Sequence, residues 1–166
     1  MAPFEFKTVP RLVCEAGCSR KMGELLAPTL QQLGVPSNTC KLFVLVDPFI
    51  AQSAQFEQVK ASLTGQGYEL HISTQVEPDP PEALVLAVSE EARLWGAQAV
   101  LGLGGGSTLD VAKLIAVLAV GTQALNTMYG VGMVNSKRLP LALAPTTSGT
   151  GSEVTPISIV TTGKDT

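Results

Sequence analysis

The stretch that decides the fold is AVLGLGGGSTLDVAK, residues 99–113. An apolar run typical of a buried strand leads into Gly104, Gly105 and Gly106, and a Ser-Thr pair then opens a predicted helix over 107–120. Glycines let a ligand approach the main chain closely, and the first N–H groups of the following helix attract an anion. The pattern therefore predicts that Gly104, Gly105, Gly106 and Ser107 bind a phosphate or pyrophosphate.

The spacing of these glycines departs from the known phosphate-binding fingerprints. Ser107 stands where the third glycine of G-x-G-x-x-G would be, and no Lys-Ser or Lys-Thr pair follows as in a P-loop. A tight turn without a ligand is therefore the alternative interpretation of this segment.

Apolar runs and helical patterns alternate along the rest of the chain. We expect strands over 4–9, 11–15, 41–47, 68–73, 97–103, 139–144 and 154–162. We expect helices over 19–34 (capped by Ser19 and kinked or restarted at Pro28), 52–63, 81–96 and 107–120. This alternation predicts an α/β fold, a Rossmann-like, mostly parallel sheet flanked by helices. Because no helix pattern follows the last expected strand, we interpret residues 1–166 as one domain that is truncated.

The composition excludes several classes of protein. The 166 residues are 45% hydrophobic, enough for a core, and the net charge of −3 argues against binding to nucleic acid. The N-terminus lacks a signal-peptide pattern. The longest uncharged stretch, 114–136, has polar residues in its middle, so we expect no membrane span and a cytoplasmic protein.

Cysteine and histidine are too few for a metal centre. Cys14, Cys18 and Cys40 form no C-x-x-C pair, so we expect free thiols rather than disulfides or a zinc site. His71 is the only histidine and lies in an expected strand, where we expect a structural role. We therefore expect no metal ligands within this chain.

Two further segments fall at the carboxyl ends of expected strands, where parallel sheets bind ligands. Asp47 directly follows the strand LFVLV, where a carboxylate can accept hydrogen bonds from an adenosine ribose and favour NAD over NADP. The alternative for Asp47 is an ordinary turn before Pro48. Thr146, Thr147 and Thr150 lie in the loop PTTSGTGSEVT, residues 145–155, which is rich in donors for a phosphate or a ribose. The alternative there is a flexible turn.

Asp110 and Lys113 are one turn apart on the helix after the glycines. Such a pair is commonly an exposed ion pair of little energetic value. Asp110 is also close to the helix start, where the helix dipole favours a carboxylate. We leave open whether it supports the loop or lines the cleft.

In combination, GGGSTLDVAK (104–113) and PTTSGTGSEVT (145–155) resemble the iron-containing (group III) alcohol dehydrogenase family, of the dehydroquinate synthase-like fold. The order of strands, the EPDPP turn and Asp47 also fall where the N-terminal domain of that family would place them. Either motif alone would be a weak signal.

The resemblance implies a metal-dependent, NAD-linked oxidation of an alcohol to an aldehyde or ketone, or its reverse. It assigns the pyrophosphate to Gly104, Gly105, Gly106 and Ser107, the adenosine ribose to Asp47, and the cofactor cleft to Thr146, Thr147 and Thr150. Asp110 and Lys113 match the family's acidic and basic positions, and we count Asp110 among the candidate cofactor-binding residues. The family's metal ligands, an aspartate and three histidines for iron or zinc, come from a helical domain after the second motif. We therefore name no catalytic residue and no metal ligand here. Homodimers occur in the family, so a homodimer is one expected assembly.

Two alternative functions follow from the same residues. The chain could be a stand-alone nucleotide-binding domain without turnover. It could also belong to another activity on this fold, such as a polyol dehydrogenase, a maleylacetate reductase or a dehydroquinate synthase. The intact GTGSE of the second loop favours an alcohol dehydrogenase.

Overall fold

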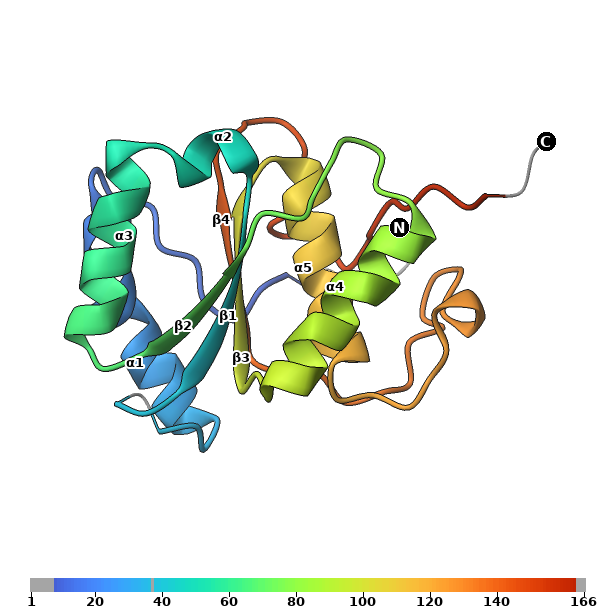
Figure 1. Ribbon diagram of the computed structural model, residues 1–166, viewed down its shortest axis with the longest axis horizontal. Helices are drawn as coiled ribbons and strands as arrows, with labels where there is room; N and C mark the ends of the chain where they lie inside the picture. Colours follow the sequence, from blue (N-terminus) through green and yellow to red (C-terminus); the bar gives the residue numbers. More distant parts are fainter. Residues whose placement is uncertain (1–7, 37, 164–166) are drawn as a thin grey trace, which may run out of the picture.

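The computed structural model describes residues 8–36 and 38–163 and has the predicted α/β architecture. Four parallel strands form one sheet in the order β2-β1-β3-β4. They are β1 (Lys41–Val46), β2 (Glu69–Ser73), β3 (Ala99–Gly104) and β4 (Leu141–Pro145). Figure 1 shows the sheet as the middle of three layers, with helices on both faces.

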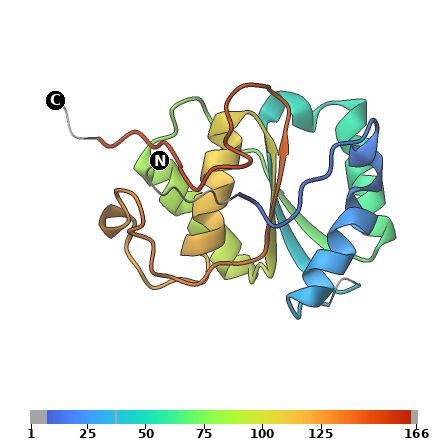
Figure 2. The ribbon, with the colours of Figure 1, turned by 180° about the vertical axis from the view of Figure 1, so that it is seen from behind.

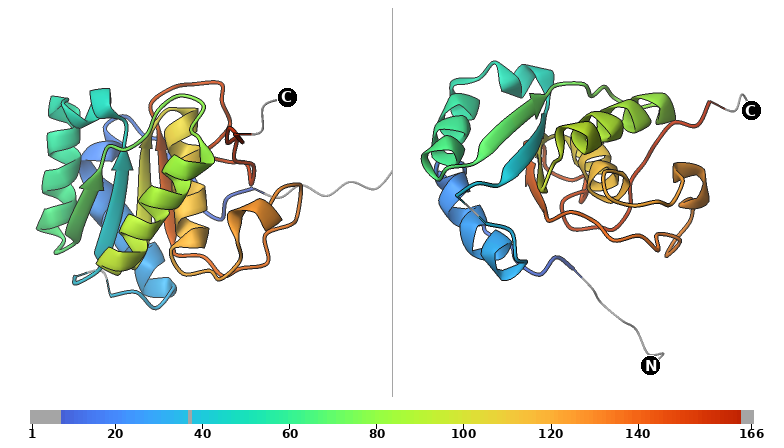
Figure 3. Two further views of the ribbon diagram at one scale, coloured as in Figure 1. Left: turned by 45° about the vertical axis from the view of Figure 1, so that its right-hand side comes forward. Right: turned by 60° about the horizontal axis from the view of Figure 1, so that its bottom comes forward.

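The helices divide into two pairs. α1 (Met22–Gln32) packs with α3 (Ala54–Gly65), and α4 (Glu82–Trp95) packs with α5 (Gly106–Leu118). Figure 2 shows the two pairs on opposite faces of the sheet. The short helix α2 (Pro48–Ala51) lies at the carboxyl end of β1, and 3₁₀ turns occupy Cys18–Lys21 and Leu125–Thr127. Figure 3 shows the segment after α5 leaving the layers before it returns as β4.

The core is built on both faces of the sheet, which explains the unbroken apolar run of β1. Leu42, Val44 and Val46 pack with α3 in one hydrophobic cluster. Phe43 and Leu45 alternate with them and pack with α4 and α5 in the other. A strand covered on both faces needs no polar side in its sequence.

Most of the expected elements are confirmed within two residues of their bounds. The helix expected over 52–63 begins at Ala54, because the hydroxyl of Ser53 accepts a hydrogen bond from the Phe56 N–H (3.1 Å) and caps it. Gly96 ends α4 with a φ of 78°, a conformation that glycine adopts easily. The first helix differs from the prediction. Ser19 lies in a 3₁₀ turn and caps no helix, and α1 runs through Pro28 without a restart.

The prediction of a strand over 11–15 is wrong, and the expected strand over 4–9 lies mostly outside the described residues. Thr8, Val9 and 11–15 have no strand pairing. The guanidinium of Arg11 instead donates to the carbonyl of Leu25 and to the hydroxyl of Thr29 (3.1 Å), both on α1. The segment is therefore attached to a helix rather than to the sheet.

The prediction of a last strand over 154–162 is also wrong. Its only pairing in the described residues is an isolated bridge between Thr161 and Pro81. Pro156 interrupts any ladder since it has no N–H. Asp110 of α5 instead accepts hydrogen bonds from the Ser158 hydroxyl and the Ile159 N–H. Ile157 and Ile159 are 57% and 69% exposed.

Candidate functional site

A crevice opens where the chain leaves two neighbouring strands toward opposite faces of the sheet. β1 continues to α2 and α3 on one face, while β3 continues to α5 on the other (Figure 1). The Asp47 N–H donates to the Leu103 carbonyl (3.0 Å) and keeps the two strand ends together. Open α/β sheets bind ligands at such a point of divergence. A cavity of about 440 Å³ lies there, lined by Asp47, Pro48, Phe49, Val76, Glu77, Pro78, Gly105, Gly106, Ser107 and Thr108.

The N-terminus of α5 opens into this cavity. Gly105 is the N-cap residue of α5. In the part of the chain that the structure describes, no side chain accepts a hydrogen bond from the first N–H groups of this helix. By contrast, side chains of Asp47 and Ser53 cap α2 and α3. The first N–H groups of a helix have no partner within it. With the positive end of the helix dipole, they form a site for an anion.

The glycines of residues 102–105 have two different roles. A Cβ on Gly102 would lie 2.6 Å from the Cβ of Ala112, and one on Gly104 would lie 2.5 Å from the Thr108 hydroxyl, so these two allow α5 to pack closely on β3. A Cβ on Gly105 would meet only Thr147, at an ordinary 3.6 Å. Packing within the fold therefore does not require a glycine at position 105. The absence of a side chain there leaves open space at the cavity wall. This geometry fits a ligand phosphate held against the main chain.

The predicted second loop lies beside the glycines. The Thr146 N–H donates to the Gly104 carbonyl (2.9 Å), which fixes the start of the loop. A Cβ on Gly106 would lie 3.2 Å from the Thr150 methyl group, so Thr150 covers Gly106 as Thr147 covers Gly105. The two motifs, far apart in sequence, are therefore neighbours in space, although no residue of the second loop lines the main cavity.

Asp47 is at the crevice, and its first role is structural. Its Oδ1 atom accepts hydrogen bonds from the Phe49 N–H (2.8 Å) and the Ile50 N–H (3.3 Å), which caps α2. Asp47 therefore has the structural role that the alternative interpretation gave it, at the turn before Pro48. Asp47 also lines the cavity together with Gly105, and the two cap hydrogen bonds use only its Oδ1 atom.

Asp110 and Lys113 bind the end of the second loop and the segment that follows it. The Asp110 carboxylate accepts from the Ile159 N–H (3.0 Å), and its backbone carbonyl accepts from the Ser158 hydroxyl (3.1 Å). Lys113 donates to the carbonyls of Ser152 (3.0 Å) and Thr155 (3.3 Å), and to that of Ile157. Asp110 does not line the cavity. Its contacts hold residues 158 and 159 in place, so they support the loop rather than a ligand.

The remaining chemically active side chains form no metal centre. In residues 8–36 and 38–163, no cluster of three or more His, Cys, Asp or Glu side chains could hold an ion. The Nε2 atom of His71 lies 2.6 Å from the Glu91 carboxylate, and its ring stacks on Phe43, so it joins β2 to α4. Cys14 is exposed and Cys40 is buried, and burial raises the pKa of the Cys40 thiol to about 11.

Sequence reasoning missed three parts of the site. Phe49 and the turn over Val76–Pro78 line the main cavity. A second cavity of about 360 Å³ adjoins Phe49 and is lined mostly by apolar side chains, with Ser19 and Thr146 at its wall. The signals were an aromatic residue two positions after the aspartate and the proline-rich EPDPP turn after β2, for which the sequence pattern predicted no binding role.

Comparisons with known proteins identify relatives of this chain. The family model for iron-containing alcohol dehydrogenase matches residues 10–166. Long-chain-alcohol dehydrogenase 1 of Geobacillus thermodenitrificans is 42% identical over 139 residues, which are 81% of this chain and 34% of that protein. The chain thus spans about a third of the length of this curated relative.

Solved structures share the same fold. NADH-dependent butanol dehydrogenase A from Thermotoga maritima superposes with a TM-score of 0.82 at 29% identity, covering 98% of this chain and 39% of that one. Sulfoacetaldehyde reductase from Bifidobacterium kashiwanohense, solved in complex with NAD⁺, gives a TM-score of 0.73 at 26% identity, with coverages of 88% and 36%. Among residues 8–36 and 38–163, no helix is both long and apolar enough to cross a membrane.

Proposed function

Because the chain belongs to the iron-containing alcohol dehydrogenase family, we propose that it is the dinucleotide-binding domain of a metal-dependent, NAD-linked alcohol dehydrogenase. The observation that carries the proposal is the uncapped N-terminus of α5, which opens with Gly105 onto a cavity shared with Asp47. Since the chain covers about a third of its relatives, the reaction of the whole protein is part of the proposal.

The described residues fit the cofactor part by part. The N–H groups of Gly106, Ser107 and Thr108 would hold the pyrophosphate, and open space at Gly105 lets it approach the main chain. Asp47 would accept the adenosine ribose hydroxyls, and its charge favours NAD over NADP by repelling a 2′-phosphate. Thr146, Thr147 and Thr150 would line the crevice on the β4 side. When bound, NAD supplies the hydride-accepting ring.

The described residues do not fit a divalent metal, since no suitable ligand cluster occurs among them. We therefore derive no step that involves iron or zinc, although a metal remains part of the proposal for the whole protein. We propose a small alcohol or aldehyde as its substrate and the cytoplasm as its location. A homodimer remains a prediction from family likeness.

Calorimetric titration of NADH into the 166-residue chain tests this proposal. We expect saturable binding that weakens by at least about 10-fold in Gly105→Val, because the new side chain fills the phosphate cradle. Gly65→Val is the matched control, since a Cβ there meets no atom within 4 Å and Gly65 lies at the end of α3, away from the cavity. Absence of NADH binding to the folded wild-type chain would refute the proposal.

A further inference from the structure

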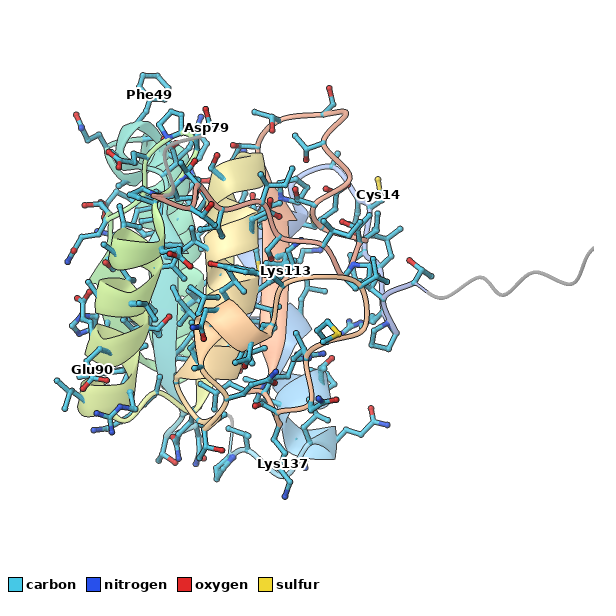
Figure 4. The ribbon with its side chains drawn as sticks, turned by 90° about the vertical axis from the view of Figure 1, so that its right-hand side faces the viewer. Cys14, Phe49, Asp79, Glu90, Lys113 and Lys137 are labelled. Carbon is cyan, nitrogen blue, oxygen red and sulfur yellow. The ribbon has the colours of Figure 1, made fainter. Side chains whose placement is uncertain are left out.

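Phe49 is the most exposed aromatic group at the crevice, and nothing in the fold itself requires it there. Its side chain is 82% exposed, although it follows directly after Asp47 and Pro48. Single exposed apolar residues are common on protein surfaces. Phe49 differs from most of them because it lines both the main cavity and the adjoining apolar one. Figure 4 shows it projecting at the same end of the molecule as Asp79, in the turn after β2.

The backbone under Phe49 is held firmly. The Asp47 carboxylate accepts a hydrogen bond from the Phe49 N–H (2.8 Å), and Pro48 restricts the chain before it. The ring is therefore carried on a fixed turn rather than on a mobile loop. A ring held in this way loses little conformational freedom when a ligand packs on it.

The β2–α4 turn supplies a wall of the cavity that is stiff and, apart from Glu77, apolar. Val76, Glu77 and Pro78 line it. Pro78, Pro80 and Pro81 limit the motion of this turn, and the Thr161 hydroxyl donates to the Asp79 carbonyl (3.0 Å) to fix it further. The cavity thus has an anion-binding helix end, a carboxylate and an apolar aromatic wall, three chemistries that match the pyrophosphate, ribose and base of an ADP group.

We infer that the ring of Phe49 stacks on the adenine base of the bound dinucleotide and positions it. This inference rests on the proposed function, since it assumes that the crevice binds NAD. We assign adenine rather than nicotinamide to the ring of Phe49. The nicotinamide ring exchanges hydride and therefore needs an open face toward its substrate. Adenine takes no part in the reaction and can be packed against an apolar wall.

The test compares ligands that contain adenine with one that does not. In Phe49→Ala we expect ADP and NADH to bind about 5- to 10-fold more weakly, as for the loss of an aromatic stack, while reduced nicotinamide mononucleotide binds as before. Phe49→Tyr should restore the affinity because it keeps the ring. Leu94→Ala, at a 74% exposed apolar residue of α4 outside both cavities, is the matched control.

A spectroscopic signature separates stacking from a merely structural role. The H2 and H8 proton resonances of bound ADP should move upfield in the wild-type chain through the ring current of Phe49, and this shift should disappear in Phe49→Ala. Unchanged ADP affinity in Phe49→Ala, an equal loss for the mononucleotide, or no upfield shift would overturn the inference while leaving the proposed function intact. Failure of the wild-type chain to bind NADH would instead refute the proposed function itself.

Discussion

The ammonium group of Lys113 lies 2.8 Å from the Oδ1 atom of Asp110, one turn earlier on α5, and the two side chains are only 12% and 8% exposed. Figure 4 shows Lys113 on the face of α5 that the C-terminal segment crosses. The same two side chains bind the backbone of Ser152, Thr155 and Ile159. From the sequence alone, this pair could be described only as an ion pair. In the structure it connects α5 to the end of the second loop and to the segment after it.

Removing Lys113 should destabilise the fold. Lys113→Met leaves the buried Asp110 carboxylate without its counter-charge, so we predict a loss of about 3 kcal/mol in the free energy of unfolding. The double variant Lys113→Met/Asp110→Asn should recover part of this loss, because no unpaired charge remains. Urea unfolding followed by the fluorescence of Trp95 measures both. A loss below about 0.5 kcal/mol, as for an exposed ion pair, would contradict the prediction.

Asp110→Asn distinguishes loop support from cofactor binding. Because Asp110 faces Ile159 rather than the cavity, we predict lower stability but an NADH affinity within about 3-fold of the wild-type value, measured on folded protein. A large loss of NADH affinity without loss of stability would instead place Asp110 on the cofactor.

The cap and ribose roles of Asp47 can be separated by Asp47→Asn. Asparagine caps a helix about as well as aspartate, so stability should change little. The negative charge is removed, so the preference for NADH over NADPH that we predict for the wild-type chain should shrink. Parallel calorimetric titrations with the two nucleotides measure it. Equal binding of both by the wild-type chain would remove the ribose role from Asp47.

Substitution by alanine should destabilise the fold at Gly102 but not at Gly105. A Cβ on Gly102 would overlap Ala112 at 2.6 Å and press on Leu143 at 3.1 Å, so Gly102→Ala should cost about 1–3 kcal/mol of stability. Gly105→Ala should leave stability nearly unchanged, since its Cβ makes ordinary contacts. Thermal unfolding of the two variants tests this division, and equal destabilisation would contradict it.

Alkaline pH should destabilise the chain through two buried groups. Burial raises the pKa of Cys40 from 9.0 to about 11, and burial together with Cys40 raises the pKa of Tyr68 from 10.0 to about 12. Above pH 9 the unfolded chain therefore binds fewer protons than the folded one, and stability falls as pH rises toward 12. Cys40→Ala should remove the part of this slope between pH 9 and 11, on the order of 1–2 kcal/mol, in urea unfolding at several pH values. An unchanged slope would contradict it.

Sequence reasoning predicted the sheet well because its signals are local and redundant. The run of β1 is apolar on both faces, and the glycines between β3 and α5 fix where strand becomes helix. It failed where tertiary contacts decide. Residues 154–162 have the composition of a strand, yet Lys113 and Asp110 bind the backbone of Thr155, Ile157 and Ile159 to α5. At the candidate site, the sequence pattern singled out both motifs and Asp47. It did not single out Phe49, because only the structure shows that Phe49 lines two cavities.

The most direct test of a dinucleotide site at the start of α5 is a nuclear magnetic resonance titration of the isotope-labelled 166-residue chain with NADH. We predict that the largest amide shifts fall on residues 105–108 and 47–49, with smaller changes at Thr146, Thr147 and Thr150. The amides of α1 and of the segment around His71 should barely move. Shifts that avoid residues 105–108, or that spread without focus over the surface, would contradict a cofactor site at the glycine turn.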